Sequence, residues 1–262
     1  MRTILLWITI MCCAIAASAS VKGVYVDYTV NGKEYQGYLA YNPEQKGLRP
    51  AVVVFPEWWG VNDYVKSRAR ELAGLGYVAF VADMYGKGVV TTLADSARQL
   101  AGAFYQDFSK FETMTNAAFE QLLKQEHVDS AKTAAIGFCF GGTAALELAR
   151  SGADLKGCIT FHGGLGTPTP EKAKNIKCPV LVLRGDADPF DEPAYLEGFE
   201  KSMTEAGAKY KVVSYPGAKH AFTNPNAGKA GLDGVEYNEA AEKASMEEMR
   251  AFFREIFAGK QE

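Results

Sequence analysis

One cysteine of this sequence lies where its sulfur could act as a nucleophile. Cys139 is the centre of the segment Gly137-Phe138-Cys139-Phe140-Gly141, which separates a short apolar run from a helical pattern. A Gly-x-nucleophile-x-Gly segment between a strand and a helix is typical of a nucleophile elbow, here with sulfur in place of the usual serine oxygen. The helix that follows would direct amide N–H groups and the positive end of its dipole at the sulfur, which favours a thiolate and later an oxyanion. The segment predicts covalent catalysis by Cys139; the alternative is a buried cysteine in a glycine-rich crossover.

Three histidines are available as the base that a cysteine nucleophile requires. His220 follows an apolar run that ends at Tyr215, so we expect it at the carboxyl edge of the sheet, where open α/β sheets bind their ligands. His162 also ends an apolar run, but it precedes the tight Gly163-Gly164 turn, where a packing or hydrogen-bonding role is expected. His127 precedes the elbow strand and is expected at the surface. His220 is therefore the predicted base.

The order nucleophile, acid, histidine requires a carboxylate between the elbow and the base. The apolar run Val180–Leu183 leads into a loop that contains three aspartates. Asp188 is the predicted acid, because the preceding glycine gives the loop room to turn back before the carboxylate is presented. We expect Asp186 to cap a turn and Asp191 to be the N-cap of the following helix.

The elements that must position these residues follow from the apolar pattern. Two runs rich in Tyr and Val flank Asn31-Gly32, which predicts an antiparallel hairpin. Downstream, short unalternated apolar runs alternate with helical patterns, which predicts a mostly parallel sheet with helices on both faces and no separate cap domain. The expected strands are 24–30, 33–41, 51–55, 78–82, 134–137, 157–161, 180–183 and 210–215, and the expected helices are 63–75, 91–125, 140–151, 193–207 and 239–258.

The N-terminus has the three parts of an export signal. A positive start is followed by the uncharged apolar run 4–17 and by the small-x-small pattern Ala17-Ser18-Ala19. We expect residues 1–19 to be a cleaved signal peptide and residues 20–262 to form a single domain in the periplasm or the medium, without a membrane anchor. The alternatives are an uncleaved anchor or a lipid attached to an early cysteine.

The overall composition is that of an ordinary globular domain. Hydrophobic residues make up 48% and charged residues 23% of the 262 residues, which excludes disorder and coiled coil as descriptions of the whole chain. The net charge of -3, without a basic run, argues against nucleic-acid partners. No metal or organic cofactor is expected, and we expect a monomer or a weak homo-oligomer.

Three cysteines would remain after export, and an odd number leaves at least one thiol free. Cys158 and Cys178 each lie at the start of an apolar run, where small buried hydrophobic residues are common. A disulfide between these two cysteines is the alternative.

At the level of motifs, the sequence resembles the dienelactone hydrolase family of the α/β-hydrolase fold. The resemblance implies a triad in which Cys139 attacks an ester or lactone carbonyl, His220 transfers protons and Asp188 orients the imidazole. It also implies an oxyanion hole from the backbone N–H groups of Phe140 and Trp58. The matching segments follow the family's order over nearly the whole chain: Pro56-Glu57-Trp58-Trp59-Gly60-Val61-Asn62, Ala82-Asp83-Met84-Tyr85, Gly137-Phe138-Cys139-Phe140-Gly141-Gly142, Gly185-Asp186-Ala187-Asp188 and Lys219-His220-Ala221-Phe222.

Glu57 matches a family glutamate that lies beside the resting nucleophile and shifts when substrate binds. A carboxylate beside a thiol disfavours the thiolate, so the sulfur would be protected from oxidation until the charge is displaced. The alternative is a solvated surface carboxylate.

The substrate region departs from the family pattern. Dienelactone hydrolases of aromatic degradation grip a substrate carboxylate with arginines, one of them shortly after the histidine, whereas Ala221-Phe222-Thr223-Asn224 contains none. Arg98 precedes the other candidate region but has no certain counterpart, which argues against an anionic dienelactone. Aromatic residues of these segments suggest an aromatic-walled pocket: Trp58, Trp59, Phe104, Tyr105 and Phe222.

The residues together predict an exported cysteine hydrolase of small carboxylic esters or lactones. Two alternatives remain open, a non-catalytic ligand-binding protein with the same fold and a thiol redox protein. The sequence contains no Cys-x-x-Cys, which disfavours redox chemistry.

Overall fold

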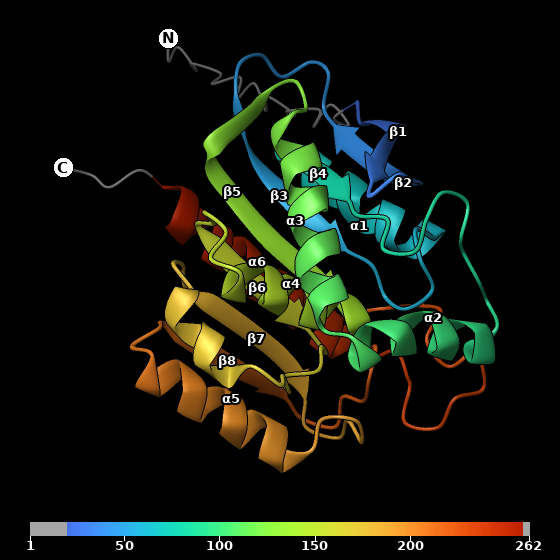
Figure 1. Ribbon diagram of the computed structural model, residues 1–262, viewed down its shortest axis with the longest axis vertical. Helices are drawn as coiled ribbons and strands as arrows, with labels where there is room; N and C mark the ends of the chain where they lie inside the picture. The colour runs from blue at the N-terminus through green and yellow to red at the C-terminus, as the bar shows by residue number, and fades with distance from the viewer. Residues whose placement is uncertain (1–19, 259–262) are drawn as a thin grey trace, which may run out of the picture.

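Eight strands form one mixed sheet in the computed structural model, which describes residues 20–258. The predicted signal peptide, residues 1–19, lies outside the described residues. The strand order is β1-β2-β4-β3-β5-β6-β7-β8, and the N-terminal hairpin lies at one edge while β8 lies at the other (Figure 1). The strands are β1 (Lys22–Val30), β2 (Lys33–Tyr41), β3 (Arg49–Phe55), β4 (Val78–Val81), β5 (Val128–Phe138), β6 (Gly157–Phe161), β7 (Val180–Gly185) and β8 (Tyr210–Tyr215).

The predicted hairpin is confirmed. β1 and β2 pair antiparallel with Val30 opposite Lys33, and both turn residues have positive φ, 50° at Asn31 and 78° at Gly32, as a two-residue hairpin turn requires. β2 pairs antiparallel with β4, and all further pairs are parallel, so the sheet is mostly parallel as predicted.

The predicted long helix 91–125 is wrong, because two helices occupy this stretch. The chain leaves helical geometry at Asp107, whose φ is -139° and ψ is 88°. The Asp107 carboxylate accepts hydrogen bonds from the backbone N–H and the hydroxyl of Ser109, so it favours a break over continuation of the helix. The helices are α1 (Asp63–Gly74), α2 (Ala94–Gln106), α3 (Ser109–Leu123), α4 (Phe140–Arg150), α5 (Pro193–Glu205) and α6 (Glu239–Phe257), with a 3₁₀ helix over Pro170–Asn175.

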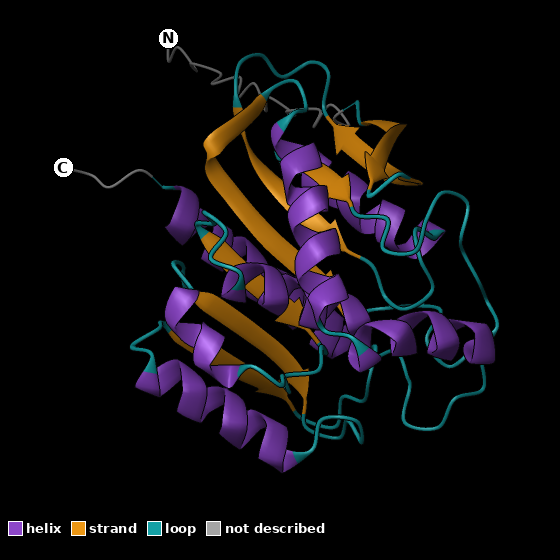
Figure 2. Cartoon of the chain, in the orientation of Figure 1, coloured by secondary structure: helices purple, strands orange, loops and turns teal. Residues whose placement is uncertain are grey.

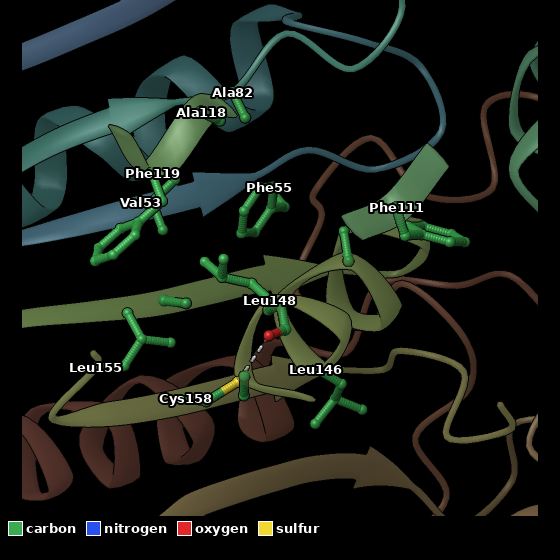
Figure 3. Packing of buried hydrophobic residues seen from close by; sticks show 14 of the residues in the cluster. Val53, Phe55, Ala82, Phe111, Ala118, Phe119, Leu146, Leu148, Leu155 and Cys158 are labelled. Carbon is green, nitrogen blue, oxygen red and sulfur yellow. Dashed lines mark hydrogen bonds between the residues drawn. The ribbon is translucent and has the colours of Figure 1, made fainter. Parts of the chain in front are cut away.

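Helices cover both faces of the sheet, which explains the unalternated apolar runs (Figure 2). Val53 and Phe55 of β3 pack in the cluster that contains residues of α3, α4 and α5, whereas Val52 and Val54 pack in the cluster of α1 and α6. Figure 3 shows the first cluster, in which Cys158 of β6 donates from its sulfur to the carbonyl of Ala145 in α4. Successive residues of β3 thus alternate between the two cores, one on each face of the sheet.

The thiols of Cys158 and Cys178 are free and buried in this structure, so the alternative disulfide is not formed. Both belong to the cluster on the α4 face, where burial raises the pKa of each thiol. Such thiols are poor nucleophiles, because the thiolate is the reactive form. Within residues 20–258, no helix combines the length and the apolar character that a bilayer span needs.

Candidate active site

Cys139 lies at a strained turn between β5 and α4. Its φ of 54° and ψ of -121° are unusual for a residue with a side chain. A Cβ atom at Gly137 would lie 1.8 Å from the carbonyl oxygen of Gly141, and one at Gly141 would lie 2.2 Å from the carbonyl oxygen of Phe55. Both glycines are therefore required for the turn, and the turn leaves Cys139 partly exposed at the carboxyl edge of the sheet.

The three residues predicted as a triad come together at this edge. Asp188, in the loop after β7, has Oδ2 2.7 Å from Nδ1 of His220, in the loop after β8. Its other oxygen, Oδ1, accepts a hydrogen bond from the N–H of Phe190 at 2.9 Å, which fixes the carboxylate. His220 and Asp188 line the same cavity as Cys139, and the charge of Cys139 acts on the imidazole. The arrangement brings together the three residue types of a nucleophile, base and acid triad.

His220 is electrostatically coupled to Cys139. Burial acts to lower the pKa of His220, but the charge of Cys139 and the hydrogen bond to Asp188 outweigh burial and raise this pKa well above its ordinary value. A raised pKa means that the imidazole of His220 accepts a proton more readily than a free histidine does, which suits a base beside a thiol. A thiolate paired with an imidazolium is the activated form of a cysteine nucleophile.

The two other aspartates of the loop after β7 have different partners. Asp186 accepts a hydrogen bond from the N–H of Gly217 at 2.6 Å, so it caps a neighbouring turn as expected. The prediction that Asp191 is a helix N-cap is wrong, because Glu192 occupies the N-cap position and makes no side-chain capping bond. Asp191 instead forms an ion pair with Arg184. An arginine within reach competes better for this carboxylate than the helix amides do.

The other histidines have the expected places. His127 is exposed at the amino end of β5, and His162 is buried at the carboxyl end of β6. Nδ1 of His162 accepts a hydrogen bond from the backbone N–H of Cys139 at 3.1 Å, which confirms its hydrogen-bonding role.

Two backbone N–H groups are candidates for an oxyanion hole. Phe140 is the first residue of α4, and Trp58 follows β3; both line the cavity next to Cys139. Among residues 20–258, neither N–H group has a hydrogen-bond acceptor. The hydroxyl of Tyr85 donates to the carbonyl of Trp58 at 3.2 Å and so fixes that segment. Free amides beside a nucleophile are the donors that a developing oxyanion needs.

Glu57 is buried rather than solvated, with 2% of its surface exposed. Its carboxylate accepts a hydrogen bond from Nδ2 of Asn224 at 2.7 Å and lines the same cavity as Cys139. Burial raises the pKa of Glu57 to about 7, although the Asn224 bond and the charge of His220 act in the opposite direction. Glu57 therefore changes its charge near neutral pH, within the cavity.

The variant Glu57→Gln is expected to be more stable than the wild type above neutral pH. Because the folded-state pKa of Glu57 is raised from 4.5 to about 7, the wild type loses stability as the pH rises through this interval, whereas the amide does not ionise and keeps the Asn224 bond. The expected gain is small at pH 5 and reaches about 3 kcal/mol above pH 8. Urea unfolding at both pH values measures it. A gain that does not depend on pH would contradict an ionisable, buried Glu57.

The site opens into a cavity of about 650 Å³. Trp58, Trp59 and Tyr105 line it as predicted, whereas Phe104 and Phe222 are buried in the two cores and do not. Sequence reasoning missed further apolar lining residues, which come from the loop before α5, from α5 itself and from the loop before α6: Phe190, Tyr195, Leu232 and Val235.

Arg98 of α2 also lines the cavity, but it is not a buried anchor. Its guanidinium pairs with Asp95 one turn earlier, and 63% of its side chain is exposed. Within residues 20–258, no group of three or more His, Cys, Asp and Glu side chains is arranged to hold a metal ion.

Comparisons with known proteins identify the family of the chain. The profile of the dienelactone hydrolase family matches residues 35–257. A probable 2-oxo-3-(5-oxofuran-2-ylidene)propanoate lactonase of Bradyrhizobium sp is 30% identical over 79% of this chain and 86% of its own length. A putative carboxymethylenebutenolidase of Aquifex aeolicus is 28% identical over 77% of this chain and 87% of its own length.

Two solved structures are similar over 91% of this chain and 99% of their own length. One, m3DLH, has a TM-score of 0.88 and 38% sequence identity. The other is a dienelactone hydrolase-like promiscuous phosphotriesterase from metagenomic libraries, with a TM-score of 0.87 and 38% identity.

Proposed function

The chain belongs to the dienelactone hydrolase family and is a hydrolase that acts on ester bonds, and we propose that Cys139, His220 and Asp188 are its catalytic triad. The observation that carries the proposal is the imidazole of His220, which hydrogen-bonds Asp188 at 2.7 Å and lines the same cavity as Cys139. Membership of a hydrolase family favours catalysis over the ligand-binding and thiol-redox alternatives.

The first half-reaction acylates the enzyme. The thiolate of Cys139 attacks the carbonyl carbon, and the oxygen becomes an oxyanion that the N–H groups of Phe140 and Trp58 stabilise. When the intermediate collapses, the bond to the leaving oxygen breaks and His220 gives its proton to that oxygen. The products of this step are an alcohol and a thioester on Cys139, and His220 is neutral.

The second half-reaction uses water. Neutral His220 takes a proton from the water molecule, whose oxygen attacks the thioester carbonyl. Collapse releases the carboxylic acid and regenerates the thiolate, while Asp188 keeps the imidazole oriented and stabilises its charge throughout. The residues of the chain thus supply the nucleophile, the proton transfer and the oxyanion donors.

Glu57 is proposed to regulate the resting state of the nucleophile. Its carboxylate shares the cavity with the sulfur and titrates near neutral pH. An ionised carboxylate near the site disfavours a second negative charge on the sulfur. A substrate that displaces Glu57 from the cavity would remove that charge and favour the thiolate.

We propose small neutral esters or lactones as the substrates. Apolar and aromatic side chains dominate the walls, and among the described lining residues Arg98 is the only Lys or Arg. Because Arg98 is exposed and already paired with Asp95, it offers little to a buried substrate carboxylate. The Bradyrhizobium relative is described as a lactonase, which supports lactones as one substrate type.

A substrate panel tests this proposal. We expect kcat/KM for a neutral phenyl acetate to exceed that of the matching phenyl hemisuccinate by at least about tenfold, since the carboxylate of the hemisuccinate would be desolvated without a cation. Arg98→Gln should change both values by less than about threefold. A preference for the hemisuccinate that disappears in Arg98→Gln would contradict the proposal. A γ-lactone and a neutral phosphotriester complete the panel, the latter because one similar structure is described as a phosphotriesterase.

We also propose that the protein is exported, with cleavage after Ala19, and acts as a monomer or a weak homo-oligomer. The three-part pattern at the N-terminus supports the proposal of export. N-terminal sequencing of the exported protein should begin at Ser20, and an intact Met1 on that protein would contradict it. Sedimentation equilibrium of the mature chain gives its state of assembly.

A further inference from the structure

His162 is an imidazole that the proposed triad does not use, although it lies beside two of its members. Its side chain is almost fully buried, with 2% of the residue exposed. Nδ1 accepts the hydrogen bond from the N–H of Cys139, and Nε2 lies 2.8 Å from Oγ1 of Thr223. Its ring meets the ring of His220 edge to face, with centroids 5.4 Å apart. His162 thus contacts the backbone of the nucleophile and the side chain of the base.

These bonds define the protonation of His162. Nδ1 accepts a hydrogen bond only when it carries no proton, so the single proton of the neutral ring is on Nε2 and is donated to Thr223. Burial, together with the positive charge of His220, lowers the pKa of His162 well below its ordinary value. A neutral ring is also the form that does not repel the imidazolium of His220.

The bond to Cys139 bears directly on the elbow. Cys139 and His162 both have positive φ, 54° and 41°, so each end of this contact is a strained backbone that its surroundings must hold. The N–H of Cys139 is shared between His162 and the carbonyl of Phe161. The next amide, that of Phe140, has no acceptor among residues 20–258 and is available for an oxyanion.

The bond to Thr223 connects the ring to the loop that carries His220. The hydroxyl of Thr223 also contacts the hydroxyl of Tyr64 at 2.6 Å, and the carbonyl of Thr223 accepts a hydrogen bond from Arg68. Both partners belong to α1, on the opposite side from α4. His162 is accordingly the bridge between the elbow and a loop that is anchored independently of the elbow.

We propose that His162 is a positioning residue, which in its neutral Nε2–H form fixes the elbow backbone of Cys139 relative to the loop that carries His220. The inference rests on the proposed function, because it assigns His162 a role in holding that triad together. The positioning role predicts both the protonation state of the His162 ring and the rate of the reaction in variants of the bridge.

The state of the ring is tested without any substrate. In the ¹⁵N-labelled wild-type protein at pH 7, we expect one histidine to show the pattern of a neutral ring protonated at Nε2, and this signal to be absent from His162→Asn. A protonated ring, or a neutral ring protonated at Nδ1, would overturn the inference even if Cys139 proves to be the nucleophile. Conversely, the assigned tautomer is measurable even if the proposed function fails.

The effect on rate is tested with two variants that treat the bridge differently. Thr223→Val keeps the shape of the side chain but removes the acceptor for Nε2–H, and His162→Leu removes the whole bridge. We expect kcat for phenyl acetate to fall by roughly tenfold in Thr223→Val and by roughly 100-fold in His162→Leu, with KM changed by less than about threefold.

A conservative replacement and a control complete the test. His162→Asn should recover at least about a tenth of the wild-type kcat, since its amide oxygen can accept the N–H of Cys139 and asparagine tolerates positive φ. Tyr64→Phe, which leaves the His162 to Thr223 bond in place, should keep kcat within about threefold of the wild type. Two results would overturn the positioning role. One is a loss of kcat that simply parallels the loss of unfolding free energy across the four variants, and the other is an effect on KM instead of kcat.

Discussion

Cys139→Ala is expected to reduce kcat for a small neutral ester by at least about 10⁴-fold, because residues of a catalytic triad act as a unit and removing the nucleophile stops covalent catalysis. The remaining activity would come from the oxyanion donors and from general base catalysis by His220 on water. Initial rates with a chromogenic ester, corrected for buffer hydrolysis, measure the loss.

The fold should survive this substitution. Alanine has the same backbone strain as cysteine at φ 54°, and the side chain of Cys139 is only partly buried. Thermal unfolding within a few degrees of the wild type is therefore the control. Cys139→Ser is the matched variant, since a hydroxyl does not ionise beside the imidazole as a thiol does, and it should lose at least about 10³-fold. Wild-type activity in folded Cys139→Ala would contradict the proposed role.

Asp188→Asn is expected to reduce kcat by about 10³- to 10⁴-fold, because the amide can donate to Nδ1 and thereby favour the wrong tautomer of His220. The Asp188 bond also contributes to the raised pKa of His220. The wild type loses the proton of His220, and with it the general acid, only as the pH rises through that raised value. In Asp188→Asn the alkaline loss of kcat/KM should therefore move to lower pH.

The matched control is Asp186→Asn, in the same loop. Asp186 bonds the N–H of Gly217 and does not contact His220, so this variant should keep kcat within about threefold. An unchanged alkaline limb in Asp188→Asn, or a similar loss in Asp186→Asn, would contradict the assignment of the acid.

Three parts of the fold could be predicted from short stretches of sequence. The hairpin at Asn31-Gly32, the buried run of β6 and the elbow around Cys139 each combine a backbone requirement with residues that meet it. These features lie within short segments, where sterics and turn chemistry decide.

Other features depended on contacts between distant segments. Nothing local indicates that Phe222 faces the core and not the cavity. The bridge through His162 joins β6 to the loop after β8, so it is visible only when the strands are placed side by side. The break at Asp107 had a local signal, an Asp-x-Ser segment within the helical pattern.

The central claim is that the sulfur of Cys139 becomes acylated during turnover. The most direct measurement is the mass of the protein, and of its peptides, after rapid mixing with an aryl ester of a hindered acid, chosen so that hydrolysis of the thioester is slow. We expect one acyl group per protein, on the peptide that contains Cys139, with a matching burst of phenol. An acyl group on a different residue, or steady hydrolysis of the ester by a protein whose Cys139 has been alkylated, would contradict the claim.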